Sequence, residues 1–199
     1  MRNKMACVLS FLMLLSFMCI EGDKDELTPR QVFLFTDNTE GGGNNWSHGG
    51  AEDEWELGKP TSGPGYSHSG SYCWGTDLDD NYNDDANAWL SSYDINLKNN
   101  FTSCALIFWH WYNIYKFVTE DHGYVEITKD NGKTWEKLAS YTGDAASEDW
   151  HEIKLNISSY IGNIIKIRFR LVSDDAFNAT GWYIDDISVI GELKKTKKD

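Results

Sequence analysis

The chain has 199 residues, 31 acidic side chains against 18 basic ones, and a formal net charge of −13 at pH 7. Nucleic-acid affinity comes largely from basic side chains that neutralise phosphates. A chain as acidic as this one is therefore expected to have no nucleic-acid partner. The length suffices for one domain with a sizeable core. The acidity suits a soluble extracellular protein, and clustered acids suit divalent cations.

The N-terminus has the outline of a secretory signal peptide. Arg2 and Lys4 precede an uncharged apolar run from Met5 to Ile20, and acidic sequence follows at once. We therefore expect residues 1–20 to be a leader and the protein to be secreted. Its removal takes away Arg2 and Lys4 and no acid, which changes the net charge from −13 to −15. Membrane attachment is the alternative, through an uncleaved leader or a lipidated Cys19.

Residues 21–30 are charged and aperiodic and are interpreted as a flexible spacer. The first strand is predicted at 31–36, and a glycine-rich loop follows at 41–45. Further strand patterns, separated by Gly, Pro, Asn or Asp, occur at 54–58, 71–76, 88–97, 105–112, 123–128, 134–141, 150–156, 165–171 and 181–191. A domain over 31–191 is thus expected, followed by a basic tail at 192–199.

Two of these segments indicate how the strands are buried. Residues 105–112 are apolar on both faces, which is typical of a strand in the centre of a sheet. Residues 165–171 alternate between apolar and basic side chains, as in a strand with one buried face. About ten short strands and no amphipathic helix predict an all-β fold, a two-sheet antiparallel β-sandwich or jelly roll.

The last strand, 181–191, contains two adjacent carboxylates, Asp185 and Asp186. Successive side chains of a strand point to opposite faces, so the pair cannot face water together if the strand is central. A buried carboxylate without a partner costs several kcal/mol. At least one of the two therefore needs a hydrogen-bonded partner, an opposite charge or a cation.

Two cysteines, Cys73 and Cys104, lie outside the expected leader. Export permits a disulfide between them, which would add about 3–4 kcal/mol in the chain-entropy model. Two buried free thiols in neighbouring strands are the alternative. Asn45, Asn100, Asn156 and Asn178 each begin an Asn-x-Ser/Thr sequence in or beside an expected loop, which makes them glycosylation candidates.

Three further motifs are interpreted as structural. Residues 128–135 resemble the Asp-box hairpin, in which Asp130 accepts backbone hydrogen bonds and Gly132 tolerates positive φ. The acidic segment 77–85 lacks the glycine and glutamate of an EF-hand and is expected to be a solvated loop. His110 is expected to pack or hydrogen-bond within its strand. No catalytic signature is found, so no catalytic residue is predicted and the protein is not expected to be an enzyme.

The order of several segments resembles a known family, the MAM-like jelly-roll module of immune inhibitor A-type secreted metallopeptidases. Related modules occur in bacillopeptidase F-like proteins and as cleaved-adhesin domains. The resemblance covers residues 31–191, and the segments that carry it are 55–65, 68–70, 73–79, 108–112, 123–127, 167–171 and 181–187.

This resemblance implies a non-catalytic accessory module with calcium as a structural ligand. Carried over to this chain, it implies Asp185 and Glu40 as the chief ligands, with Asp37, Asn38 or Asp186 as supplements. The family often has an acid where this chain has Asn38, which weakens the ligand set. The family often has glycine where this chain has Asp80, which puts the geometry of that turn in doubt. Peptidase activity is not implied.

We therefore expect a secreted or cell-surface MAM-like module, stabilised by calcium, that mediates adhesion or protein recognition. A carbohydrate-binding module that uses exposed aromatic side chains is the alternative, so the partner is a protein or a glycan. Asp185 is expected to face the cation near Glu40. Asp186, on the opposite face, is expected to pair with a basic neighbour such as Arg168 or Arg170.

Overall fold

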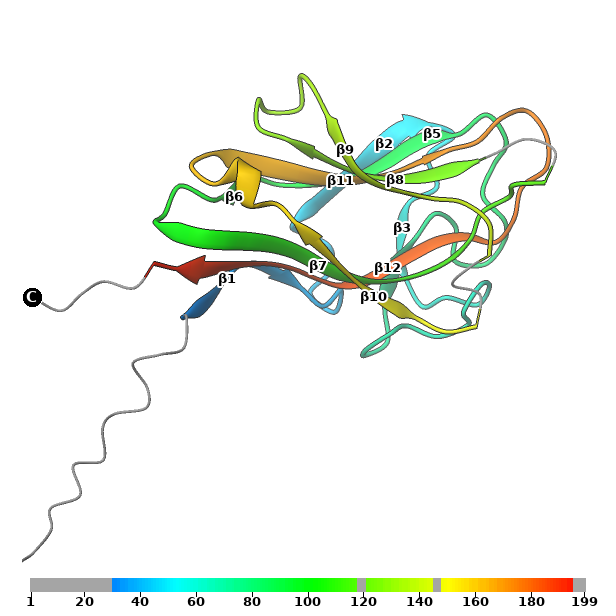
Figure 1. The fold of residues 1–199 in the computed structure, drawn as a ribbon. Coiled ribbons are helices and arrows are strands. Elements are labelled where there is room, and N and C mark those ends of the chain that lie inside the picture. The colour runs from blue at the N-terminus through cyan, green and yellow to red at the C-terminus, as the bar shows by residue number, and fades with distance from the viewer. Residues whose placement is uncertain (1–29, 118–120, 145–147, 195–199) are drawn as a thin grey trace, which may run out of the picture.

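The computed structural model describes residues 30–117, 121–144 and 148–194. In these ranges, twelve strands form two antiparallel sheets that lie face to face (Figure 1), which confirms the predicted β-sandwich. No helix within them combines the length and the apolar character needed to cross a bilayer. The expected leader, most of the spacer and the end of the basic tail lie outside the described residues.

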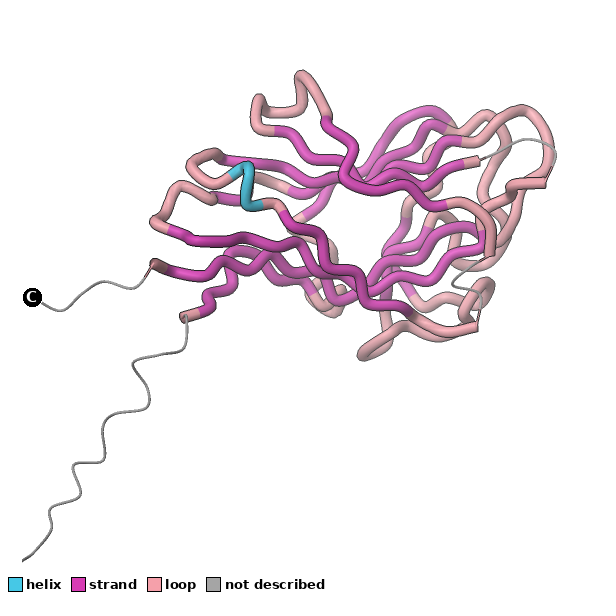
Figure 2. The backbone as a smooth tube through the Cα atoms, in the orientation of Figure 1, coloured by secondary structure: helices cyan, strands magenta, loops and turns pink. Residues whose placement is uncertain are grey.

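The two sheets contain six strands each. In the first, the order is β10 (His151–Asn156), β7 (Phe101–Asn113), β12 (Gly181–Leu193), β4 (Cys73–Gly75) and β3 (Glu56–Gly58), and β1 (Gln31–Asp37) also pairs with β12. In the second, it is β2 (Trp46–Ala51), β5 (Asn87–Ser92), β11 (Ile164–Val172), β8 (His122–Thr128) and β9 (Glu136–Tyr141), and β6 (Ile95–Asn96) also pairs with β11. Figure 2 shows these two layers and the 3₁₀ turn at Ser158–Tyr160.

All ten predicted strands are found, with shifted ends, and two features were not predicted. The segment 88–97 divides into β5 and β6. The strand β2 lies in a segment that was not assigned as a strand, because its polar and glycine-rich sequence lacks strand-forming residues. Gly50 of β2 has φ 123°, and a Cβ there would lie 2.2 Å from the Asn87 carbonyl oxygen, so the edge pairing requires glycine.

The main core fills the space between the sheets. The apolar face of β11 is buried there as predicted, and Phe169 contacts Phe108 of β7 and Trp182 of β12 through edge-to-face rings. His110 also points into this core and accepts a hydrogen bond from Trp182 Nε1 at 3.2 Å. Burial, with a smaller contribution from His151, lowers the pKa of His110 to about 3, so it is a neutral core residue.

A second apolar cluster covers the other face of the first sheet. It consists of Cys73, Leu78, Trp111, Trp150 and Tyr183, and Trp109 packs against it. Loop residues supply part of this cover, so the outer face of the sheet is not open to water along its whole length. Side chains on this face, including Asp185, can therefore be buried without entering the main core.

Cys73 and Cys104 are buried free thiols, so the disulfide prediction is wrong. The alternative is correct in the burial and free state of the thiols but not in their placement, because β12 lies between the strands β4 and β7 that carry them. Cys73 belongs to the outer cluster and Cys104 to the main core. Cys104 lies opposite Gly191, whereas Trp74, next to Cys73, lies opposite Ile184, seven residues away along β12. The two thiols are thus about 20 Å apart along the strand, far beyond the reach of a disulfide.

Candidate functional site

A β-bulge in the last strand organises the site. Asp185 pairs with Trp109 of β7 and Ser188 pairs with Ile107, so β12 carries one extra residue between these points. Asp186 lies in this bulge and has φ 46°, in the left-handed region that L-residues rarely adopt. Ile187 then fills the core position. The prediction that the two carboxylates lie on opposite faces is therefore wrong, because the bulge interrupts the alternation.

Asp185 is fully buried, with 0% exposure. Its Oδ1 accepts hydrogen bonds from the Thr39 hydroxyl at 2.9 Å and the Asp186 N–H at 2.7 Å, and its Oδ2 accepts one from the Ser69 N–H at 3.0 Å. These donors are uncharged. Burial raises the pKa of Asp185 to about 6, although the hydrogen bonds oppose the rise. The site holds a carboxyl group whose charge has no cationic partner among these contacts.

Asp186 contacts the loop that links β3 to β4. Its Oδ2 lies 2.6 Å from His68 Nδ1, and its Oδ1 accepts a hydrogen bond from Ser69 Oγ at 3.0 Å. Three possible ligand atoms lie within 4.8 Å of one another here, one each from His68, Asp185 and Asp186. The His68 ring stacks on Trp109 at 3.8 Å. In the sequence, His68 belongs to the segment 68–70 that carries the family resemblance, but no role in the site is predicted for it.

Glu40 holds the opposite side of the same loop. Its Oε1 accepts hydrogen bonds from the backbone N–H groups of Ser71 and Tyr72, both at 2.8 Å. A Cβ on Gly70, which has φ 59°, would lie 2.4 Å from that oxygen, so the approach requires glycine. Asp185 and Glu40 thus bind successive parts of one loop, as the predicted proximity requires, but Glu40 is not in the group of three ligand atoms.

The other two predicted ligands lie apart from this group. Asp37 Oδ1 accepts a hydrogen bond from Thr39 N–H at 2.7 Å, and its Oδ2 accepts one from Trp46 Nε1 at 2.7 Å. These bonds fix a turn in which Thr39 has φ 65° and its hydroxyl reaches Asp185. Asn38 is exposed. Asp37 therefore positions Thr39, while its part in cation binding stays a prediction.

The expected pairing of Asp186 with Arg168 or Arg170 is wrong. Both arginines lie on β11 in the second sheet and bind the carboxylate of Glu126 on β8. Arg168 and Glu126 occupy directly opposite positions of the two strands, which brings the charges together. Asp186 instead belongs to the first sheet and faces His68.

Ser69, His68 and Asp186 do not form a nucleophilic triad. The serine hydroxyl and the imidazole both contact the carboxylate of Asp186, one on each oxygen. An activated serine would instead donate its proton to the imidazole, whose other nitrogen would face the acid. The arrangement can bind a cation or hold a loop, and it has no group poised for acyl transfer.

A second group of carboxylates lies near the acidic loop. Ligand oxygens of Glu56, Asp77 and Asp79 lie within 4.8 Å of one another. Asp77 Oδ1 caps the turn by accepting hydrogen bonds from the N–H groups of Asp79 and Asp80, both at 2.9 Å. A hydrogen bond to Asp77 and the charge of that residue raise the pKa of Asp79, which is exposed.

The hairpin predicted to resemble an Asp-box has the expected turn chemistry. Asp130 accepts hydrogen bonds from the Thr134 N–H at 3.0 Å and the Thr134 hydroxyl at 2.6 Å. These contacts and the Thr128 hydroxyl hold the pKa of Asp130 well below its usual range. The motif therefore closes the turn between β8 and β9.

The four glycosylation candidates differ in their surroundings. Asn45, Asn100 and Asn156 are exposed. Asn178 is half-buried, and its Nδ2, the atom that would carry a glycan, donates a hydrogen bond to Asp84 Oδ1 at 3.2 Å. Use of the four positions stays a prediction, with Asn178 the least accessible of them.

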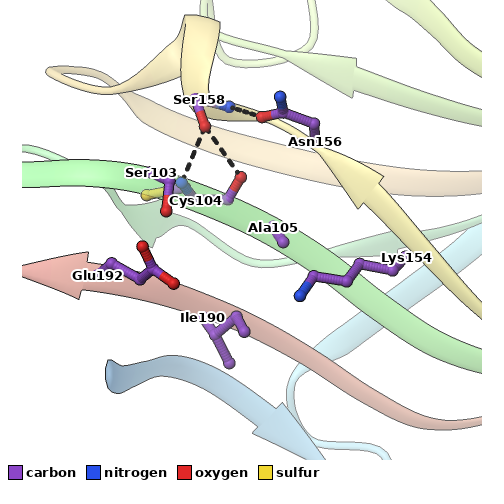
Figure 3. A pocket seen from close by; sticks show the side chains of 8 residues that line it. All are labelled: Ser103, Cys104, Ala105, Lys154, Asn156, Ser158, Ile190 and Glu192. Atoms are coloured by element: carbon purple, nitrogen blue, oxygen red, sulfur yellow. Dashed lines mark hydrogen bonds between the residues drawn. The ribbon is translucent and has the colours of Figure 1, made fainter. Parts of the chain in front are cut away.

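A pocket of about 360 Å³ lies over the first sheet, far along β12 from the bulge. Figure 3 shows Lys154 of β10 extending across the strands toward Ile190 and Glu192 of β12, while Ser158 hydrogen-bonds to Cys104. None of the residues that line the pocket is aromatic, so it offers no ring on which a sugar could stack. The glycosylation candidate Asn156 also lines it.

Comparison with protein families finds no matching family model. Over 142 residues, or 71% of this chain, the sequence is 34% identical to bacillopeptidase F of Bacillus subtilis (strain 168). The chain spans about a tenth (10%) of the length of that protein. The similarity therefore concerns one segment of a much larger protein.

Solved structures share the fold at low sequence identity. The K1 cleaved adhesin domain of Lys-gingipain from Porphyromonas gingivalis W83 is 14% identical, with a TM-score of 0.58 over 81% of this chain and 98% of that domain. The xylan-binding domain CBM22-1 of Paenibacillus barcinonensis Xyn10C is 10% identical, with a TM-score of 0.50 over 84% and 99%. The chain therefore carries a β-sandwich module related to a segment of bacillopeptidase F and similar in fold to cleaved adhesin domains.

Proposed function

We propose that this protein is a non-catalytic, extracellular recognition module of the MAM-like type whose sandwich is stabilised by calcium. The bulge at Asp186 is the observation that carries the proposal. It places a carboxyl group with 0% exposure beside a second carboxylate, at the cost of a left-handed residue. A strained backbone next to a buried ionisable group is typical of a functional site.

The donors around Asp185 suit a hard cation. The carboxylates of Asp185 and Asp186 and the Thr39 hydroxyl are oxygen ligands of the kind that Ca²⁺ prefers. The Tyr72 carbonyl oxygen lies 2.5 Å from the same hydroxyl, so it adds a backbone oxygen nearby. A cation there would supply the positive charge that the hydrogen-bond donors of Asp185 lack. His68 is a nitrogen donor and would then serve as a neighbour that orients Asp186.

Calcium should therefore raise the melting temperature of protein that has been treated with EDTA. A ligand that binds only the folded state at about a thousandfold excess over Kd adds about 4 kcal/mol, or about 10 °C for a chain of this size. Differential scanning calorimetry over a calcium series measures the effect. An unchanged melting temperature across the whole series would refute a structural calcium ion.

The recognition role is supported by the similar proteins. The domain of Lys-gingipain is named as a cleaved adhesin, and the sequence relative is a bacillopeptidase of which this chain matches a minor segment. An accessory module that binds a protein or a cell surface fits both, and such a module acts outside the cell.

Carbohydrate binding is the second candidate, because aromatic rings gather beside the bulge. Tyr66 is 54% exposed, and its carbonyl oxygen accepts a hydrogen bond from Trp150 Nε1 at 3.2 Å. The half-buried Trp109 and the imidazole of His68 form a stacked pair on the same side. The fold is also that of a domain described as xylan-binding.

If this surface binds sugars, Trp109→Ala should reduce the affinity for xylan oligosaccharides at least tenfold, since stacking on the ring would be lost. Isothermal titration measures the change, and Phe33→Ala, which removes an exposed ring from β1, is the matched control. A protein that binds no member of a glycan array, or a Trp109→Ala variant with unchanged affinity, excludes this second candidate.

A further inference from the structure

Three loops meet at one end of the sandwich and expose aromatic rings there. The loops contain residues 77–86, 114–117 and 173–180 and lie at the right-hand end of Figures 1 and 2. Tyr115 stacks on Phe177 with ring centroids 5.3 Å apart and lies edge-on to Phe117 at 5.9 Å. Phe117 is 82% exposed and Phe177 is 58% exposed. We call these three rings the aromatic loop end.

Buried hydrogen bonds join the three loops beneath the rings. Tyr82, which is 1% exposed, donates its hydroxyl proton to Asp121 Oδ2 at 2.5 Å and accepts a hydrogen bond from the Tyr115 N–H at 3.0 Å. The other oxygen of Asp121 accepts the N–H of Asp174 at 3.1 Å. Asp121 has 0% exposure. Each loop is thus tied to the next, and the rings are held in place before any partner arrives.

Phe177 is exposed in spite of an unfavourable backbone. Its φ of 64° lies in the left-handed region, where a bulky side chain is an outlier. Because the ring is largely exposed, it contributes little hydrophobic free energy, and this contribution does not compensate for the backbone conformation. A strained backbone that presents an apolar ring to water is typical of a binding surface.

The charge around the aromatic loop end is strongly negative. Residues 77–86 and 173–180 carry seven aspartates and no lysine or arginine. Asp84, Asp85 and Asp175 are exposed, and the Asp85 N–H donates to the Asp174 carbonyl oxygen at 2.6 Å, which keeps the acidic loops together. Lys116, between Tyr115 and Phe117, is the basic residue in the described part of the third loop.

We propose that the aromatic loop end is the docking surface for a basic protein segment. Its arginine or lysine side chains would stack on the faces of the rings and pair with the flanking aspartates. A neutral glycan would gain nothing from the concentrated negative charge. This inference rests on the proposed recognition function and names the chemistry of the partner and the place where it binds.

The test is a fluorescence anisotropy titration of the protein with a labelled peptide of alternating arginine and glycine. Phe177→Asn, which introduces a residue type that tolerates positive φ, and Phe117→Ala should each weaken binding roughly three- to fivefold. Asp175→Asn should also weaken it, and added salt should reduce it further. Phe33→Ala and Glu152→Gln, which make the same kinds of change elsewhere on the surface, should leave it unchanged.

Several results would overturn the proposal. They are equal losses in the control variants, equal binding of a glycine-serine peptide, and unchanged binding in both phenylalanine variants. If Phe177→Asn melts at a much lower temperature, Phe117→Ala alone decides. Displacement of the peptide by xylan oligosaccharides would make a sugar the occupant instead. Failure here leaves the calcium response intact, whereas failure of the calcium site leaves peptide binding intact, so the two are distinguishable.

Discussion

Replacing Asp185 with asparagine should abolish the rise in melting temperature that calcium gives to the unsubstituted protein. The carboxylate is fully buried and receives its three hydrogen bonds from uncharged donors, so the variant loses the charge that would attract the ion. Without calcium the variant should still lose about 1–3 kcal/mol of folding stability, because the asparagine Nδ2 is a donor and must face one of the donors that now bind the two carboxylate oxygens. Calorimetry with and without calcium measures both effects. Calcium should raise the melting temperature of the unsubstituted protein by about 10 °C and leave that of the variant unchanged.

The matched control for this variant is Asp94→Asn, which removes one carboxylate from the exposed turn between β5 and β6. It should keep the full response to calcium. The group formed by Glu56, Asp77 and Asp79 is the competing location for an ion. If Asp77→Asn loses the calcium response while Asp185→Asn keeps it, the ion binds at that group and the proposed site is wrong.

Hydrophobic periodicity predicted most of the fold because it depends on local alternation. The apolar positions of β11 and the two-sided apolar character of β7 follow directly from which faces these strands bury. Periodicity failed where β12 departs from regular geometry. Nothing in the sequence around Asp186 indicates a bulge, since a left-handed residue there would be expected to be glycine. The alternation rule therefore assigned Asp186 to the wrong face.

The rest of the candidate site depends on contacts between distant segments. His68 and Asp186 are 118 residues apart in the sequence, and Thr39 and Asp185 are 146 apart. Such pairs follow from the path of the β3–β4 loop over the sheet, which periodicity does not describe. The family resemblance did indicate that the end of the first strand approaches the last strand, and the hydrogen bond from Thr39 to Asp185 shows that approach.

The ion pairs of Glu126 lie on the other sheet and were also not predicted. Its Oε2 lies 2.5 Å from Arg168 Nε, and its Oε1 lies 2.9 Å from Arg170 Nη2. The glutamate side chain is 8% exposed and the arginine side chains about a fifth exposed, at 19% and 21%. Arg168 also stacks on Trp135 at 4.2 Å, and Arg170 on Tyr124 at 4.9 Å. One buried carboxylate thus holds two arginines against two rings.

Replacing Glu126 with alanine should therefore cost about 3 kcal/mol of folding stability, because two half-buried arginines lose their shared partner. For a chain of this size the melting temperature should fall by about 10 °C. Glu152→Gln, which removes an exposed charge on β10, should change it by a degree or less. A Glu126→Ala variant that melts within two degrees or so of the unsubstituted protein would show that the pairs contribute little.

The pH dependence of this loss identifies its cause. Burial alone would raise the pKa of Glu126, but hydrogen bonds from Arg170 and Arg168 and their charges outweigh it and hold the pKa below its ordinary value of 4.5. A carboxylate whose pKa is depressed by folding stabilises the native state above its unfolded pKa, and this contribution disappears as the pH falls through the folded value. The stability difference between the unsubstituted protein and Glu126→Gln should therefore be constant from neutral pH down to about 5 and should shrink below about 4.5. A difference that is independent of pH would mean that Glu126 acts through shape and packing, whereas one that shrinks identifies its negative charge as the group that holds the two arginines on this face.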